Sequence, residues 1–169
     1  MPRNILDDID IVEGFPPVDL SAGANSGDYV KLTNHAGCLV VFHSGVGTDG
    51  DDPTLTLQQA TNAAGGGAKA LNFTVIYRKQ AATNLAAVTA WTRTTQAAGN
   101  TYTNTDLAEQ SALLVVDVKA DDLDVANGFD WLRATVTDVG ANAKPGSLHY
   151  ILYGPRYGQS PATKLSAIS

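Results

Sequence analysis

The chain has one cysteine and few basic residues. A single thiol cannot form an intrachain disulfide, and Cys38 lies in an apolar run where we expect it to be buried in the core. Lys and Arg number 11 against 17 Asp and Glu, which gives a net charge of −6, and the basic residues are spread along the chain. Nucleic-acid binding requires clustered basic side chains, so this composition argues against it.

Long hydrophobic segments are also lacking. The longest apolar run, Ala112 to Val116, is far shorter than the roughly 20 residues of a membrane span. The N-terminus has no apolar segment of the kind found in a secretory signal. These features predict a protein that binds no membrane and is made in a reducing cytoplasm.

The polar residues that are present favour β-structure. Charged residues make up 17% of the 169 residues, and Thr, Asn, Gln, Ser and Gly supply much of the remaining polarity. No stretch has the 3.6-residue apolar period of a long helix, whereas segments such as residues 54–59 alternate with a period of two. The length suits one domain.

Short predicted strands separated by turn signals follow one another at intervals of roughly 10–20 residues. About eight such strands, with unequal loops, favour an all-β, jelly-roll-like sandwich over an up-and-down barrel. One helical turn is expected at residues 120–124. The predicted strands cover residues 29–32, 39–43, 54–59, 73–78, 88–94, 101–103, 113–119, 131–137 and 148–153.

The predicted sandwich domain, residues 27–153, is flanked by an extended N-terminal arm, residues 1–26, and a C-terminal tail, residues 154–169. The double proline at positions 16 and 17 excludes a helix or a central strand there. The arm is too apolar to remain solvated, so it packs either on its own domain or on a neighbouring chain. We expect interaction residues in both segments. They are Ile5, Leu6, Ile9, Ile11 and Val12 in the arm, and Tyr157, Leu165 and Ile168 in the tail.

Catalytic patterns are weak, and we expect the protein not to be an enzyme. His35, His43 and His149 have none of the spacings that converge on zinc. His43 precedes a serine, but the Gly-x-Ser-x-Gly elbow of a nucleophilic serine is missing. The two glutamates, Glu13 and Glu109, are not placed to form a glycosidase pair.

The weak metal candidates are three aspartates in one loop: Asp49, Asp51 and Asp52. Carboxylates in a flexible loop suit calcium, but the glutamate that completes an EF-hand is absent, so a solvated turn is favoured. Trp91 and Trp131 either form an aromatic platform for a sugar or pack in the core, which is expected for at least one of them. No cofactor is expected.

Two parts of the chain resemble small virion proteins encoded by tailed bacteriophages. One combines residues 52–60 with 67–73, and the other combines residues 123–130 with 148–152 and 155–157. The resemblance spans most of residues 28–157 and leaves out the arm and the tail. It implies a capsid cement or decoration protein, a class that is β-rich and binds the outside of the phage head as dimers or trimers.

This resemblance implies a non-enzymatic structural protein at the capsid surface of a virion, made in the cytoplasm of a host bacterium. Its partners would be further copies of itself and the major capsid protein. A carbohydrate- or receptor-binding module remains as the alternative, with calcium at the aspartate loop and a tryptophan platform. A tail-tube or head–tail connector protein is a variant of the first interpretation.

Overall fold

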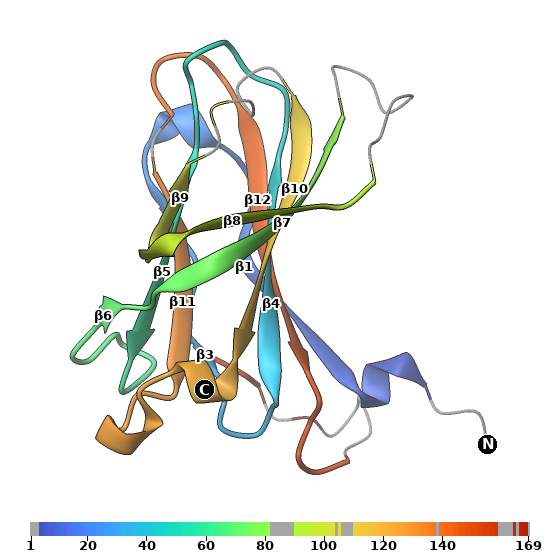
Figure 1. Cartoon of the computed structure of the whole chain (residues 1–169), viewed down its shortest axis with the longest axis vertical. Coiled ribbons are helices and arrows are strands. Elements are labelled where there is room, and N and C mark those ends of the chain that lie inside the picture. Colours follow the sequence, from blue (N-terminus) through green and yellow to red (C-terminus); the bar gives the residue numbers. More distant parts are fainter. Residues whose placement is uncertain are drawn as a thin grey trace.

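The computed structural model of the chain describes residues 4–81, 90–103, 105, 110–137, 139–158, 164 and 166–168. These residues form two antiparallel β-sheets, with short 3₁₀ turns between some strands (Figure 1). The two sheets share one continuous hydrophobic core. The predicted all-β sandwich is therefore confirmed.

The larger sheet, sheet A, has six strands. Both of its edge strands are unpaired on one side within the described chain. Figure 1 shows β7 and β8 running obliquely across the other strands, as expected from the twist of a wide sheet. In spatial order its strands are β1 (Ile9–Asp19), β12 (Pro145–Tyr153), β4 (Gly37–Ser44), β10 (Ser111–Lys119), β7 (Phe73–Ala81) and β8 (Thr92–Gly99).

The smaller sheet, sheet B, is centred on β11 (Trp131–Val136) and β5 (Thr54–Ala60). Four short strands pair with these two. They are β2 (Asn25–Ser26) and β3 (Val30–Lys31) on β11, and β6 (Lys69–Ala70) and β9 (Thr101–Thr103) on β5. Of these, β3 and β9 fall on predicted strands, whereas β2 and β6 were not predicted. The chain passes repeatedly from one sheet to the other, as in a jelly roll, and its first and last long strands are neighbours.

Four 3₁₀ turns lie in the described chain, and the predicted turn at residues 120–124 is confirmed by one of them. None of these helical segments has the length and apolar character that a membrane crossing requires. They are η1 (Ile5–Asp7), η2 (Leu20–Ala22), η5 (Ala120–Asp122) and η6 (Val125–Asn127).

Alternation along the strands sends one set of side chains into the space between the sheets. Phe42, Leu114, Leu132 and Tyr150 are fully buried there. The Tyr150 hydroxyl accepts a hydrogen bond of 2.8 Å from the Ala134 backbone N–H, which joins sheet A to sheet B. Burial raises the pKa of this phenol, so it stays neutral.

Cys38 is also buried, as the sequence predicted. Burial raises the pKa of its thiol, since the thiolate would have to lose its hydration. The thiol is thus an inert part of the core.

The N-terminal segment is part of the sandwich. Residues 9–19 of the predicted arm form β1, which pairs with β12 along its whole length. The two prolines lie in this edge strand, where a missing N–H is tolerated, and the register shifts on either side of Phe15. Apolar side chains and the main chain both favour this pairing, so most of the predicted arm packs on its own domain.

The described part of the C-terminal segment also contacts the domain. Ala167 is buried, and its carbonyl oxygen accepts a hydrogen bond of 2.8 Å from the Lys31 N–H. The Lys164 ammonium donates to the carbonyl oxygens of Leu6 and Ile9. The described part of the C-terminal segment therefore contacts both the start of β1 and strand β3.

Candidate functional site

The outer face of sheet A is the most unusual surface of the molecule. Its strands alternate between two apolar sets: one faces sheet B, and the other faces away from it. The second set surrounds an open hollow of about 510 Å³. We call this surface the outer apolar face; it consists of Leu39 and Val41 on β4, Leu113 and Val115 on β10, Ile151 on β12, Tyr77 on β7, and Trp91 just before β8.

These side chains are accessible to solvent to very different degrees. The aliphatic residues in the centre are half-buried by their neighbours, whereas Tyr77 is 38% and Trp91 is 52% exposed. Ile11 of β1, opposite Ile151 in the register, extends the same face and is 54% exposed. Contiguous apolar patches of this kind on soluble proteins generally mark an interaction surface.

One border of the outer apolar face carries a neutralised polar network. The Lys119 ammonium lies 2.5 Å from a carboxylate oxygen of Asp117 and donates to the Tyr153 hydroxyl over 2.7 Å. Tyr153 in turn donates to the other Asp117 oxygen over 2.6 Å. The hydrogen bond to Asp117 raises the pKa of Lys119, and desolvation raises the pKa of Tyr153. The three groups satisfy one another.

Among the described residues, the other charges on this face lie toward opposite edges of the sheet. Glu13 lies on the exposed side of β1, whereas Lys79 and Arg93 lie on β7 and β8. The Lys79 ammonium is 5.7 Å from the centre of the Trp91 ring, a cation–π distance. The outer apolar face is therefore acidic at one edge and basic at the other.

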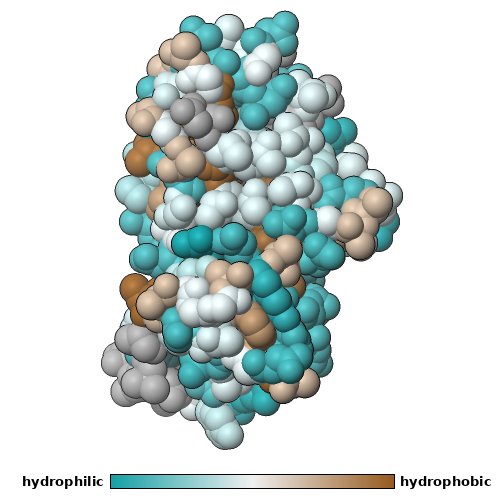
Figure 2. Space-filling view, turned by 90° about the vertical axis from the view of Figure 1, so that its left-hand side faces the viewer, coloured by the Kyte–Doolittle hydropathy of each residue, from teal (hydrophilic) through white to brown (hydrophobic). Residues whose placement is uncertain are grey.

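Most of the outer face of sheet B is polar, although at the start of β11 Trp131 packs with Tyr29 and Ala60 in a small separate cluster. Thr56 and Thr135 are directly opposite each other, and the neighbouring pair, Gln58 and Arg133, is joined by a hydrogen bond of 2.6 Å. Figure 2 views the side of the molecule on which β5, β9 and β11 lie in Figure 1, and it is mainly pale and teal with small separate brown areas. Sheet B thus presents a surface suited to water.

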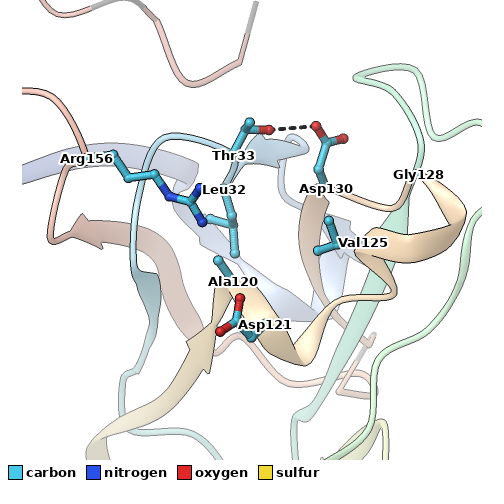
Figure 3. Close-up of a pocket in the computed structure, with 8 residues that line it drawn as sticks. All are labelled: Leu32, Thr33, Ala120, Asp121, Val125, Gly128, Asp130 and Arg156. Carbon is cyan, nitrogen blue, oxygen red and sulfur yellow. Dashed lines mark hydrogen bonds between the residues drawn. The ribbon is translucent and has the colours of Figure 1, made fainter.

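A small pocket lies at one end of the sandwich, between η5, η6 and the start of β11 (Figure 3). Its volume is about 190 Å³, below the roughly 300–1,000 Å³ of ordinary ligand sites. Its acidic group is already bound, because Asp130 accepts a hydrogen bond of 2.6 Å from the Thr33 hydroxyl and lies 3.6 Å from the Lys31 ammonium. Arg156 and Asp121 line the rim and are exposed.

The predicted interaction residues of the arm separate into two groups. Val12 packs against the core, and Ile9 is partly buried. Ile5, Leu6 and Ile11 are exposed. By register, Ile9 and Ile11 both project on the outer side of sheet A: Ile11 lies opposite Ile151 of the outer apolar face, and Ile9 lies opposite Tyr153 of the polar network at its border.

Two of the predicted tail residues, Tyr157 and Ile168, are exposed. Leu165 lies outside the described residues. Tyr157 and Ile168 remain available for contact but are not brought together with the outer apolar face.

The aspartate loop shows no metal-binding geometry in its described atoms. Asp51 accepts a hydrogen bond of 3.0 Å from the Asn142 side chain. In the described part of the chain, no three His, Cys, Asp or Glu side chains gather into a group that could hold a metal ion. Asp49 and Asp52 lie on either side of Asp51 in the same loop.

The histidines and tryptophans are distributed between the core and the surface. His43 is exposed and His149 half-buried on sheet A, and His35 is partly buried in a turn. Desolvation lowers the pKa of His35, so its neutral form is favoured. Trp131 is only 7% exposed, which confirms a packing role for one of the two tryptophans, whereas Trp91 is at the surface.

Sequence reasoning missed most of the outer apolar face. It predicted residues 113–119 as a central strand because the run is nearly all apolar, and β10 is indeed central. Such runs typically belong to strands covered on both faces. The nearly continuous apolar run could therefore have indicated a second apolar side of this strand, the side on which Leu113 and Val115 face away from sheet B.

No protein-family model matches the sequence, and no curated protein matches it. Among solved structures, the chain is similar to the SPBc2 prophage-derived protein YomS, with a TM-score of 0.46 and 12% sequence identity. The alignment covers 87% of this chain and 94% of that chain. The neighbour comes from a prophage; a likeness this distant does not assign a function.

Proposed function

We propose that the chain is a non-enzymatic structural protein of a phage virion, which self-associates and binds the outside of the capsid as a decoration protein. The observation that carries the adhesive role is the outer apolar face. It is continuous across β12, β4, β10 and β7, and the described chain leaves it open to solvent. Burying such a face against protein is worth about 25 cal/mol per Å² of apolar area.

The capsid as the partner is supported by the sequence resemblance to virion proteins of tailed phages. A cement protein must hold its shape while contacting several neighbours. The sandwich provides two separate contact regions, the outer apolar face and the exposed side chains near the chain ends, Ile5, Leu6 and Tyr157. One region would join copies of the chain and the other would contact the shell.

The proposal is tested on particles of the phage that carries this gene, prepared with the gene intact and with the gene deleted. We expect the protein to co-purify with intact particles and to appear as added density on the outer shell by electron microscopy. Particles without it should lose DNA at a lower temperature. Intact particles that lack the protein, or density confined to the tail, would contradict the capsid assignment.

A second candidate, carbohydrate binding, is favoured by one observation: two exposed aromatic rings, Tyr77 and Trp91, line the same hollow. Sugar rings stack on such side chains in binding modules. A glycan array with the Trp91→Ala variant as control tests this function. Glycan binding that depends on Trp91 would support carbohydrate binding, and an array without specific signals would contradict it.

A further inference from the structure

We propose that two copies of this chain stack through their outer apolar faces in a two-fold dimer whose axis runs parallel to the strands. The inference rests on the proposed function and deepens it, because it names the partner on this face and the orientation of the contact. The register of sheet A and the charges at its two edges support this dimer.

A single row of side chains crosses the whole outer apolar face. Each residue of the row is paired, in the strand register, with the next residue of the row. Directly paired residues project on the same side of a sheet. The row runs from a carboxylate on one edge strand, through an apolar centre, to a guanidinium on the other edge strand. It consists of Glu13, His149, Val41, Val115, Tyr77 and Arg93.

The row is long enough to keep its ends electrostatically separate. It crosses five gaps between strands, which is roughly 24 Å at the usual strand spacing. This exceeds the Debye length of about 8 Å at physiological ionic strength. Lys79 adds a second cation at the Arg93 end, whereas Asp117 is neutralised by Lys119. Along this row of described residues the charge therefore changes from negative on β1 to positive on β8; the cation beside the start of β1, Lys164, is bound to the carbonyl oxygens of Leu6 and Ile9 and lies outside the row.

This gradient selects one of two ways in which identical faces can stack. With the two-fold axis across the strands, β1 would lie over β1, and Glu13 of each copy would face the same residue of the other. With the axis along the strands, β1 lies over β8, so that each Glu13 faces Arg93 of the second copy. Packed sheets are about 10 Å apart, a gap that a Glu and an Arg side chain can bridge together.

A second copy fits this face better than an unrelated occupant because the pattern is complementary to itself. A two-fold interface uses the same patch on both subunits, so it needs opposite charges placed symmetrically about the axis. The row meets this condition, with Val41 and Val115 at its centre and opposite charges at its ends. Charge pairs at the rim chiefly set the orientation, while the apolar centre supplies most of the affinity.

Reversal of charge tests the orientation. We expect the full chain to sediment as a dimer, and Glu13→Arg or Arg93→Glu alone to weaken dimerisation at least about tenfold, because each creates two like-charge contacts. The double variant Glu13→Arg/Arg93→Glu should restore dimerisation. The control variants Asp121→Arg and Arg156→Glu make the same charge changes at the end of the sandwich. They should leave the sedimenting mass of the dimer unchanged. Circular dichroism verifies folding of every variant.

Four results would overturn the dimer: a wild-type monomer over the whole concentration range, single variants without effect, a double variant that is not rescued, or controls that weaken association equally. These outcomes are separable from failure of the virion role. A rescued dimer that is absent from purified particles would refute the capsid function alone. A chain that is present on particles but shows no charge rescue would refute only this dimer.

Discussion

The two outer faces of the sandwich have the same backbone geometry and opposite surface chemistry. At the centre of sheet A, the directly paired residues Val41 and Val115 lie in an apolar face with a hollow beside them. At the corresponding place on sheet B, the pair is Thr56 and Thr135. Valine and threonine have nearly the same shape and both favour strands, so the difference lies in hydration and not in folding.

This contrast shows which requirement each face meets. Antiparallel sheets commonly expose one face to water, and sheet B follows this rule with Thr, Gln and Arg side chains. Sheet A departs from it, although the fold needs only its inner face to form the core. The proposed contact with a second copy would account for the outer apolar residues, and substitutions on the two sides of the sheet separate this role from that of the core.

The largest effect is expected on the inner side of sheet A. Phe42→Ala would leave a cavity beneath sheet B and lower the free energy of unfolding by about 3–5 kcal/mol. Val41→Thr, its neighbour on the opposite side of the same strand, should change the stability of the monomer by less than about 0.5 kcal/mol. Urea denaturation of the two variants measures both values. Equal losses would show that both sides of β4 belong to the core.

The next largest effect is expected on dimer affinity, when the central valine pair of sheet A is replaced by threonines. Val41→Thr/Val115→Thr replaces four methyl groups in a dimer, and at ~0.8 kcal/mol each this amounts to weakening of dimerisation on the order of 100-fold. The reverse exchange, Thr56→Val/Thr135→Val on sheet B, should leave the dimer unchanged. Sedimentation velocity over a dilution series compares them. An identical response of both variants would eliminate the difference between the faces.

A hydrogen bond between the two sheets should contribute more to stability than one on the outer face of sheet A. Tyr150→Phe leaves the buried Ala134 N–H without its acceptor, and we expect a loss of about 1–3 kcal/mol in unfolding free energy. Tyr153→Phe removes a hydroxyl from the Asp117–Lys119 network, where water can replace it, at a cost of less than about 1 kcal/mol. A larger loss for Tyr153→Phe would show that its network is covered in the monomer.

The smallest effect is a pH dependence at His35, which lies in a turn outside both faces. Its folded pKa is lowered, first by desolvation, from an ordinary value of 6.5. The unfolded chain therefore takes up the proton first, and stability should fall as the pH decreases through about 6.5. His35→Gln should flatten this slope between pH 7.5 and 5.5 in thermal melts. A slope that survives the substitution would assign the effect to other groups.

Much of the fold could be predicted because its signals are local. Alternating segments and turn residues located most of the long strands, and the double proline correctly excluded a central position for β1. The pairing of β1 with β12 links residues more than a hundred positions apart, so no local pattern predicts it. Likewise, Ala167 is small, and its burial depends entirely on where the tail returns to the domain.

The candidate surface was harder to predict for a physical reason. An apolar side chain in a strand has the same sequence signature whether its own chain or another chain covers it. Leu113 and Val115 therefore resemble core residues until the sheet order shows which side is open. The exposed residues near the N-terminus, Ile5 and Leu6, could be recognised because they occur in a segment with no apparent core of its own.

The most direct test of the account is oxidative labelling of the two tryptophans as a function of protein concentration. Trp91 lines the outer apolar face, whereas Trp131 is buried within a single copy and serves as the internal reference. We expect Trp91 to be labelled in dilute solution and to become protected as the dimer forms, with Trp131 protected throughout. Labelling of Trp91 that stays constant while the mass doubles would contradict the claim that this face is the interface.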